Sequence, residues 1–257
     1  MRIATWNING LRARIDFIRT WLEAREPDVV GLQELKITDE EFPFDIFHEL
    51  GYDVVTHGQK GWNGVAILTR NQAETEQVGL PGQEDFGARL ISVKIADLHF
   101  ATVYCPNGKD VGHDDFPRKL EWFDALAGYW AGRYAADTLA VLCGDFNIVR
   151  HAMDSWRGTG ADGGLFHTVE ERARLDALLQ TGLFDIFRER YPDLEAHSWW
   201  DYRGGAFHRG QGLRIDLVLG SAALLARVRN VEIDRDFRKK KDGLTASDHA
   251  PVIVDLE

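Results

Sequence analysis

Short apolar runs alternate along the chain with longer stretches in which apolar residues recur every three or four positions. The short runs are bounded by turn residues such as Gly, Asn and Asp, a pattern typical of β-strands. Strands are predicted at residues 2–8, 28–34, 51–58, 64–70, 90–96, 98–105, 139–147, 214–221, 227–234 and 250–257. Several of these runs are joined by short turns, so part of the sheet structure is predicted to be antiparallel.

Three stretches with helical spacing predict α-helices, at residues 11–24, 116–133 and 168–182. The expected inward faces are Leu11, Ile15, Ile18 and Leu22 in the first helix, and Leu120, Phe123, Leu126 and Trp130 in the second. The third begins with Thr168 and Glu171 as a capping box and ends near Gly182. Many strands with interspersed helices predict an α/β fold, a four-layer α/β sandwich of two packed mixed β-sheets flanked by helices. Without a repeat or a linker, residues 1–257 are expected to form a single domain.

Composition adds few constraints. The apolar content of 44% and the eight Trp residues allow a large core. The two cysteines, Cys105 and Cys143, fit no metal-ligand spacing and are expected to be buried, reduced thiols. No apolar run is long enough to cross a membrane, and the N-terminus has no signal-peptide core. We therefore expect a soluble, cytoplasmic protein with no membrane partner, and a monomer is the default expectation.

The net charge of −11 does not by itself favour a nucleic-acid partner, because proteins that bind nucleic acids are usually basic. However, carboxylates around a divalent cation are formally negative only until the cation is bound. Residues 237–243 (FRKKKDG) and 116–119 (FPRK) could also form locally basic faces, or could be solvated turns. Charge therefore leaves the partner open.

Polar residues recur where the predicted strands begin or end, at positions that a core strand does not require. They are Asn7, Glu34, Asp145, Asn147, Asp216, Asp248 and His249. Each one alone could be a turn former, and Asp216 could pair with the neighbouring Arg214. Buried carboxylates are costly unless they are paired or metal-bound, and α/β folds place their sites at strand ends. Together, these residues predict one site at the edge of the sheets.

This predicted site is rich in oxygen donors and has a single histidine. Carboxylate and amide oxygens suit Mg²⁺, with Mn²⁺ as a substitute, better than they suit zinc. A carboxylate can serve as the base for a water molecule, and a histidine held by a second carboxylate can stabilise charge on a phosphate. The residues therefore indicate metal-dependent phosphoester hydrolysis without identifying the ester.

Seven segments in order along the chain carry a family resemblance: NINGLRAR, PDVVGLQELK, HGQKGWNGVAIL, GDFNI, SWWDYR, GLRIDLVL and SDHAPV. They resemble the bacterial exonuclease III family of abasic-site endonucleases, within the endonuclease/exonuclease/phosphatase superfamily. The resemblance implies a Mg²⁺-dependent DNA repair nuclease. It would cut double-stranded DNA 5′ to abasic sites, and it would process blocked 3′ ends as a 3′–5′ exonuclease or 3′-phosphodiesterase.

The resemblance also assigns roles residue by residue. Glu34 is implied as the principal metal ligand with support from Asn7, and Asp145 as the residue that activates water. The remaining catalytic roles fall on Asn147 as the partner of Asp145, either contacting the phosphate or orienting Asp145, and on His249 at the phosphate, Asp216 as the carboxylate that holds His249, and Tyr104 reaching the scissile phosphate. Asp145, Asn147, Asp248 and His249 complete the implied metal-site set, with Asp248 as a second-site ligand or a supporting acid.

On the DNA side, the resemblance implies that Arg89 contacts the backbone and that Trp199, Leu213 and Ile215 form the walls of an abasic pocket. Ile215 could equally be an ordinary core residue. Residues 150–168 depart from the family pattern, which leaves open the DNA contacts of this segment and the balance of exonuclease to endonuclease activity.

Two alternatives remain open on the same fold. One is a catalytically inactive regulator that binds nucleic acid, although such a chain would not need all of the catalytic motifs. The other is a superfamily phosphatase that acts on a small or lipid phosphoester. Cleavage of an abasic oligonucleotide, or release of phosphate from inositol phosphates with DNA untouched, separates these possibilities.

Overall fold

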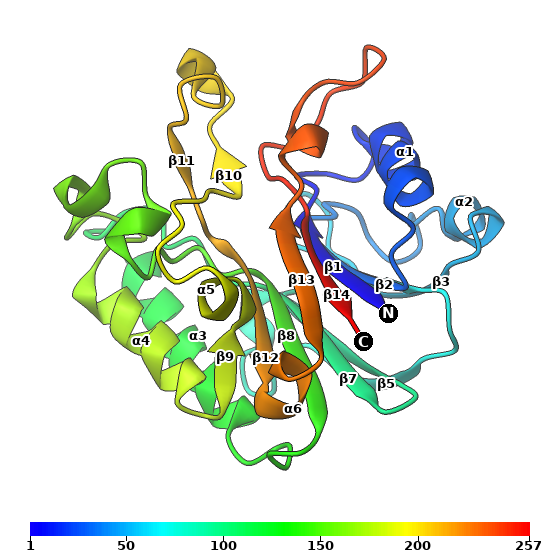
Figure 1. Cartoon of the computed structure of the whole chain (residues 1–257), viewed down its shortest axis with the longest axis horizontal. Coiled ribbons are helices and arrows are strands. Elements are labelled where there is room, and N and C mark those ends of the chain that lie inside the picture. The colour runs from blue at the N-terminus through cyan, green and yellow to red at the C-terminus, as the bar shows by residue number, and fades with distance from the viewer.

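The computed structural model describes all 257 residues and has four layers. Two β-sheets pack face to face, and helices cover the outer face of each sheet (Figure 1). This arrangement confirms the predicted four-layer sandwich.

The first sheet has six strands in the order β13–β14–β1–β2–β4–β3. Its strands are β1 (Arg2–Asn7), β2 (Val29–Gln33), β3 (Asp53–His57), β4 (Val65–Thr69), β13 (Val228–Ile233) and β14 (Val252–Leu256). Strands β1 and β2 are parallel, and all other neighbours are antiparallel, so the sheet is mixed.

The second sheet also has six strands, in the order β5–β6–β7–β8–β12–β9. Its strands are β5 (Glu74–Val78), β6 (Leu90–Ile95), β7 (Leu98–Tyr104), β8 (Leu139–Asp145), β9 (Leu183–Asp185) and β12 (Asp216–Ser221). Here β7 and β8 form the parallel pair, with Tyr104 level with Asp145. The two sheets thus share one plan, a parallel pair within antiparallel neighbours.

Six α-helices complete the layers: α1 (Ile15–Arg25), α2 (Phe44–Glu49), α3 (Asp115–Trp130), α4 (Val169–Leu179), α5 (Ile186–Arg190) and α6 (Ala222–Leu225). Apolar side chains of α1 and α2 pack on the first sheet, and those of α3 and α4 on the second. A separate cluster of 20 buried residues fills the space between the sheets. This shared inner core fixes the sheets against each other, and hence the strand ends that carry the site.

The structure corrects parts of the predicted helical faces. Helix α1 starts at Ile15, so the buried Leu11 precedes it, and Ile15 itself is only partly buried. In α3, Leu120 is partly buried while the neighbouring Lys119 is fully buried. The predicted capping box of α4 is confirmed, with Thr168 accepting from the Glu171 amide. Both cysteines are free and buried, as predicted.

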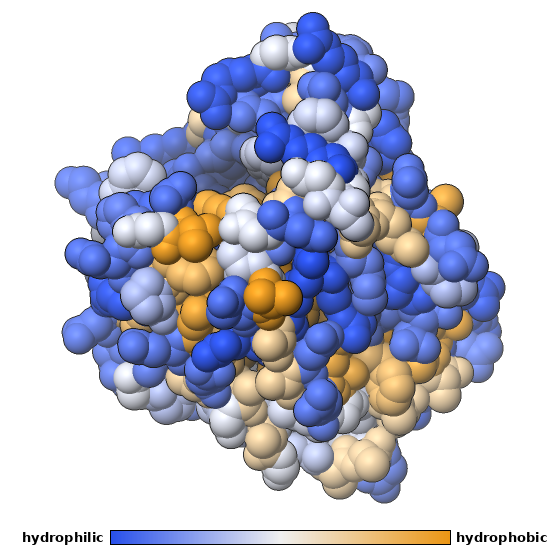
Figure 2. Space-filling view, turned by 90° about the vertical axis from the view of Figure 1, so that its left-hand side faces the viewer, coloured by the Kyte–Doolittle hydropathy of each residue, from blue (hydrophilic) through white to orange (hydrophobic).

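Two protrusions extend from the same end of the sandwich (Figure 1). One is residues 199–213, the finger, which contains β10 (Trp199–Trp200) and β11 (Gly212–Leu213). The other is the loop between β13 and β14. The face on the finger side is mostly hydrophilic, with apolar side chains in small groups (Figure 2). None of the helices is long and apolar enough to cross a membrane.

Candidate active site

Asn7 and Glu34 follow from the parallel pairing of β1 and β2. Asn7 is the last residue of β1 and pairs with Gln33, so Glu34 comes just beyond the end of β2. The buried Asn7 amide donates to Glu34 Oε1 at 2.8 Å and to Asp145 Oδ2 at 2.9 Å. One amide therefore links a carboxylate of the first sheet to a carboxylate of the second. Lys36 Nζ lies 2.8 Å from Glu34 Oε2 and fixes its other oxygen.

Asp145 ends β8 in the middle of the second sheet, level with Tyr104 on one side and Asp216 on the other. The preceding residue must be glycine, because a Cβ on Gly144 (φ +144°) would lie 1.9 Å from the Val103 carbonyl oxygen. Burial is the main cause that raises the pKa of Asp145, to about 7, with Asp216 and Glu34 adding to it and His249 opposing it. A carboxylate with such a pKa is suited to accept a proton near neutral pH.

Asn147 adopts a left-handed conformation (φ 51°) in the turn that follows Asp145. Its backbone amide donates to Asp145 Oδ1 at 2.9 Å, and its side-chain amide donates to the Cys105 carbonyl at 3.0 Å. The buried Lys119 donates to the Asn147 carbonyl at 2.7 Å. Asn147 therefore orients Asp145 through its backbone, as one of its two predicted roles requires.

His249 and Asp216 meet across the two sheets. His249 Nδ1 lies 2.9 Å and 3.0 Å from the Asp216 oxygens, and Ser198 Oγ donates to Asp216 at 2.6 Å. Burial by itself lowers the pKa of His249, but the charge and hydrogen bond of Asp216 outweigh it and raise this pKa to about 10. His249 is thus an imidazolium at neutral pH. Asp216 does not pair with Arg214, so that possible interpretation is wrong.

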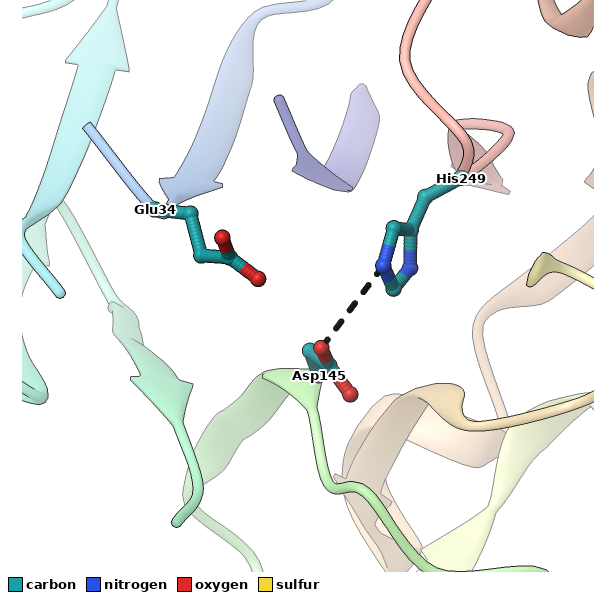
Figure 3. Close-up of side chains that lie close together, drawn as sticks. All are labelled: Glu34, Asp145 and His249. Carbon is teal, nitrogen blue, oxygen red and sulfur yellow. Dashed lines mark ion pairs between the residues drawn. The ribbon is translucent and has the colours of Figure 1, made fainter. Parts of the chain in front are cut away.

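Three of these side chains converge, with Glu34, Asp145 and His249 pointing toward one another from three chain segments (Figure 3). One donor atom from each lies within 4.8 Å of the others, and His249 Nε2 is 3.9 Å from Asp145 Oδ2. Two converging carboxylates offer the oxygen donors that hard divalent cations prefer. Glu34 and Asp145 could therefore hold such a cation, with His249 beside it.

Asp248 lies outside this convergent trio. Its Oδ1 accepts from Asn9 Nδ2 at 2.9 Å and its Oδ2 from Trp199 Nε1 at 3.0 Å. Burial raises the pKa of Asp248, but the His249 charge and these hydrogen bonds outweigh it and lower the pKa overall. Asp248 thereby fastens the finger to the loop after β1. Asn9 and Ser198 were not singled out from the sequence, because each acts through a residue distant along the chain.

Tyr104 and Arg89 line a cavity of about 750 Å³ on one side of the trio. Arg89 donates to the Tyr104 carbonyl at 3.0 Å, and its guanidinium lies 5.0 Å from the Tyr104 ring centre. Burial, with the negative charges of Glu34 and Asp145, raises the pKa of Tyr104 well above its usual range. Its hydroxyl is therefore protonated and able to donate a hydrogen bond at neutral pH.

A second cavity, of about 680 Å³, lies on the other side and is lined by Trp199 and Leu213. The Trp199 ring centre is 6.5 Å from that of His249. Ile215 does not line this cavity; it is buried behind it against Leu213 and Val149. The lining also includes four residues that the sequence interpretation missed: Ser155, Trp156, Phe166 and His167. All four belong to the segment 150–168, whose aromatic residues in an irregular Gly-rich stretch were the available signal.

The two basic segments are partly paired within the fold. In residues 237–243, Arg238 is buried and donates to the Asp248 and Trp200 carbonyls, Lys239 and Lys241 both pair with Asp236, and the exposed Lys240 has no carboxylate partner. In residues 116–119, Lys119 is buried against Glu171, whereas the exposed Arg118 lies over the Phe86 ring and lines the same cavity as Tyr104.

A four-layer α/β sandwich with this carboxylate and histidine centre defines the class of metal-dependent phosphoester hydrolases. The chain belongs to the endonuclease/exonuclease/phosphatase family, whose model matches residues 4–249. It is 37% identical to exodeoxyribonuclease III of Haemophilus influenzae over 273 residues, with all of both chains covered. The chain is therefore an enzyme, a nuclease of a metal-dependent family.

Two solved structures agree closely with this one over the whole chain. The first is the 3′ phosphatase NExo from Neisseria bound to a product DNA hairpin, with a TM-score of 0.95 and 34% identity over 100% of this chain and 99% of that chain. The second is an AP endonuclease from Archaeoglobus fulgidus, with a TM-score of 0.95 and 30% identity over the same shares.

Proposed function

We propose that this nuclease uses Mg²⁺ to hydrolyse the phosphodiester 5′ to abasic sites in double-stranded DNA. The observation that carries the proposal is the convergence of Glu34, Asp145 and His249 next to the cavity lined by Trp199 and Leu213. The cavity has aromatic and aliphatic walls suited to a flipped-out sugar that lacks a base. The relatives named as an exodeoxyribonuclease and as an AP endonuclease support a DNA substrate.

Each protein group has a distinct task in the proposed reaction. Asp145 aligns a water molecule and accepts its proton as the water oxygen attacks phosphorus. The P–O3′ bond breaks, and the 3′ oxygen takes up a proton to become a hydroxyl. The His249 imidazolium, held by Asp216, and the Tyr104 hydroxyl donate to the phosphate oxygens as their charge grows. Mg²⁺ would be held by Glu34 and Asp145, which the Asn7 amide orients, and it would neutralise phosphate charge and polarise the bond.

Processing of 3′ ends is the second candidate activity. It is favoured by the likeness to the 3′ phosphatase from Neisseria over the whole chain. A 3′-phosphate or a blocked 3′ end presents a terminal phosphoester, which could enter the same site without an intact strand on its far side. The same side chains would act on both substrates, so the two activities differ only in how DNA enters the site.

Labelled duplexes separate these activities. One carries a single internal abasic site, one is intact, and one ends in a 3′-phosphate; each is incubated with the protein and Mg²⁺. We expect incision of the first, leaving a 3′-hydroxyl, and release of phosphate from the third. If only the third reacts, the abasic proposal is wrong and 3′-end processing stands. If none reacts, while inositol phosphates lose phosphate, the enzyme is a superfamily phosphatase.

The His249–Asp216 pair predicts the alkaline limit of activity. The imidazolium is needed, so activity should fall as pH rises through the His249 pKa of about 10. Asp216 raises this pKa, so an Asp216→Ala variant should lose activity at a lower pH than the wild type. The measurement is kcat/KM against pH on the abasic duplex. An unchanged alkaline limb in Asp216→Ala would contradict this assignment.

We further propose that residues 1–257 act as one domain and as a monomer. The core between the sheets, which draws on strands from both ends of the chain, supports the single domain. Light scattering after size-exclusion chromatography tests the oligomeric state, and a dimer mass would contradict the monomer.

A further inference from the structure

Four charged side chains form a buried cluster beneath the finger, separate from the convergent trio. Asp154, Asp185 and Arg214 are at most 2% exposed, and Arg188 is 8% exposed. Two carboxylates and two guanidinium groups make the cluster electrically neutral. Such clusters are often no more stabilising than apolar residues of equal volume, so their geometry is a better guide to their role.

Arg214 is the centre of this cluster and makes two carboxylate forks. Toward Asp154, its Nε and Nη2 donate at 2.7 and 3.0 Å; toward Asp185, its Nη1 and Nη2 donate at 3.1 and 2.8 Å. Asp185 also caps α5, accepting from the Arg188 amide. A planar guanidinium with two bidentate partners has little rotational freedom. The cluster is therefore a rigid joint between three chain segments.

This joint docks the segment around Asp154 onto the chain of the finger. The Arg214 amide donates to the Asp154 carbonyl at 2.8 Å, and the Trp156 amide donates to the Gly212 carbonyl at 3.0 Å. Between them, Ser155 forms an antiparallel bridge with Leu213. Residues 154–156 thus run along residues 212–214, locked at one end by the side chain of Arg214.

Both docked segments line the cavity beside His249. Ser155 and Trp156 of one segment and Leu213 of the other contribute to its wall, together with Trp199. The catalytic groups have supports of their own: Ser198 holds Asp216, and Asn7 holds Glu34 and Asp145. Loosening the joint should therefore alter the cavity while leaving the trio in place.

We infer that Arg214 is a positioning residue that, through Asp154, sets the cavity wall against which the deoxyribose beside the scissile phosphate docks. This inference rests on the proposed function, because the cavity is taken as the DNA-sugar site. It separates the role of Arg214 from that of Asp216 two residues later. Arg214 affects the affinity of the cavity for DNA, whereas Asp216 holds His249 and raises its pKa.

The test variant removes one positive and one negative charge from the buried cluster. The double variant Arg214→Met/Asp154→Leu keeps the cluster electrically neutral, but it removes the ion-pair partner of Asp185, which is Arg214, and that of Arg188, which is Asp154. We expect its KM for the abasic duplex to rise about tenfold or more, with kcat within about threefold of the wild type. Amide hydrogens of residues 154–157 should exchange faster. The control Arg25→Met/Asp234→Leu removes a partly buried ion pair between α1 and the residue after β13, and should leave KM unchanged.

A thermal melt shows whether each variant is folded, and Arg214→Lys, which keeps the charge without the forks, should show a smaller rise in KM. An unchanged KM in the folded double variant, or an equal rise in the control, would overturn the inference. If the wild type leaves the DNA uncut, the proposed function fails instead. In that case the amide hydrogen exchange of residues 154–157 in the double variant still tests the joint. Exchange at the wild-type rate would refute the role of Arg214 in holding this segment.

Discussion

Replacing Asp145 by Asn should lower kcat on the abasic duplex by about 10²- to 10⁴-fold, the range for loss of a general base. The substitution keeps the size of the side chain, and its amide can still accept from the Asn147 backbone amide as Asp145 Oδ1 does. It removes the group that accepts the water proton. Single-turnover kinetics at saturating DNA measure the effect.

The matched control is Asp137→Asn, at an exposed position with no ion-pair partner. Its kcat should equal that of the wild type. DNA affinity of Asp145→Asn, measured by fluorescence anisotropy in EDTA, should stay close to the wild-type value, since no DNA-contacting charge is proposed there. Undiminished turnover in a folded Asp145→Asn variant would transfer the role of base to another residue.

Glu34→Gln should weaken the binding of Mg²⁺ without destabilising the fold. The neutral amide removes a charged oxygen donor, and the Asn7 amide loses its charged acceptor at the same time. We expect the Mg²⁺ concentration for half-maximal activity to rise by about 10- to 100-fold or more. The measurement is a Mg²⁺ titration of cleavage rate, with calorimetry of Mg²⁺ binding as a readout independent of activity.

Glu49→Gln, at an exposed position on α2, is the control for this change. The cleavage rate of this control should depend on the Mg²⁺ concentration in the same way as that of the wild type. Equal Mg²⁺ requirements in Glu34→Gln and wild type would show that Glu34 is not the principal ligand. Asp145 or Asp248 would then be the next residues to examine.

The strands that the sequence predicted were those with strong apolar runs. Strand β5 (Glu74–Val78) was missed because its sequence, ETEQV, is polar and it lies at the edge of its sheet, half exposed. The inward face of α3 was misassigned at Leu120 because apolar spacing cannot reveal that Lys119 is buried by its pairing with Glu171. Helix 11–24 was begun too early because Leu11, although buried, precedes the first helical turn.

The convergence of the site could be predicted because its members share a position at strand ends. Glu34, Asp145 and His249 were grouped on that ground, and the structure brings them together. The hydrogen bonds that hold them could not be predicted. Ser198 and Asn9 are ordinary polar residues until the fold places them beside Asp216 and Asp248. The Arg214 forks depend on Asp154 and Asp185, 60 and 29 residues away in the chain.

Net charge was a poor guide to function for a similar reason. The −11 total includes the carboxylates of the site, whose charge a bound cation would offset. Three lysines of the basic segments that might have suggested a DNA face are paired with carboxylates of the chain: Lys119 with Glu171, and Lys239 and Lys241 with Asp236. The inactive-regulator alternative gains nothing from the structure, because every group that the proposed chemistry needs is present around one centre.

We expect this chain to cleave abasic DNA with a divalent cation held at Glu34 and Asp145. One abasic duplex is followed beside its intact counterpart, first with Mg²⁺ and then with EDTA in excess. The abasic duplex alone should be incised, 5′ to the lesion, and only with Mg²⁺. Cleavage that persists in EDTA, or an abasic duplex left whole in Mg²⁺, would refute the proposed function.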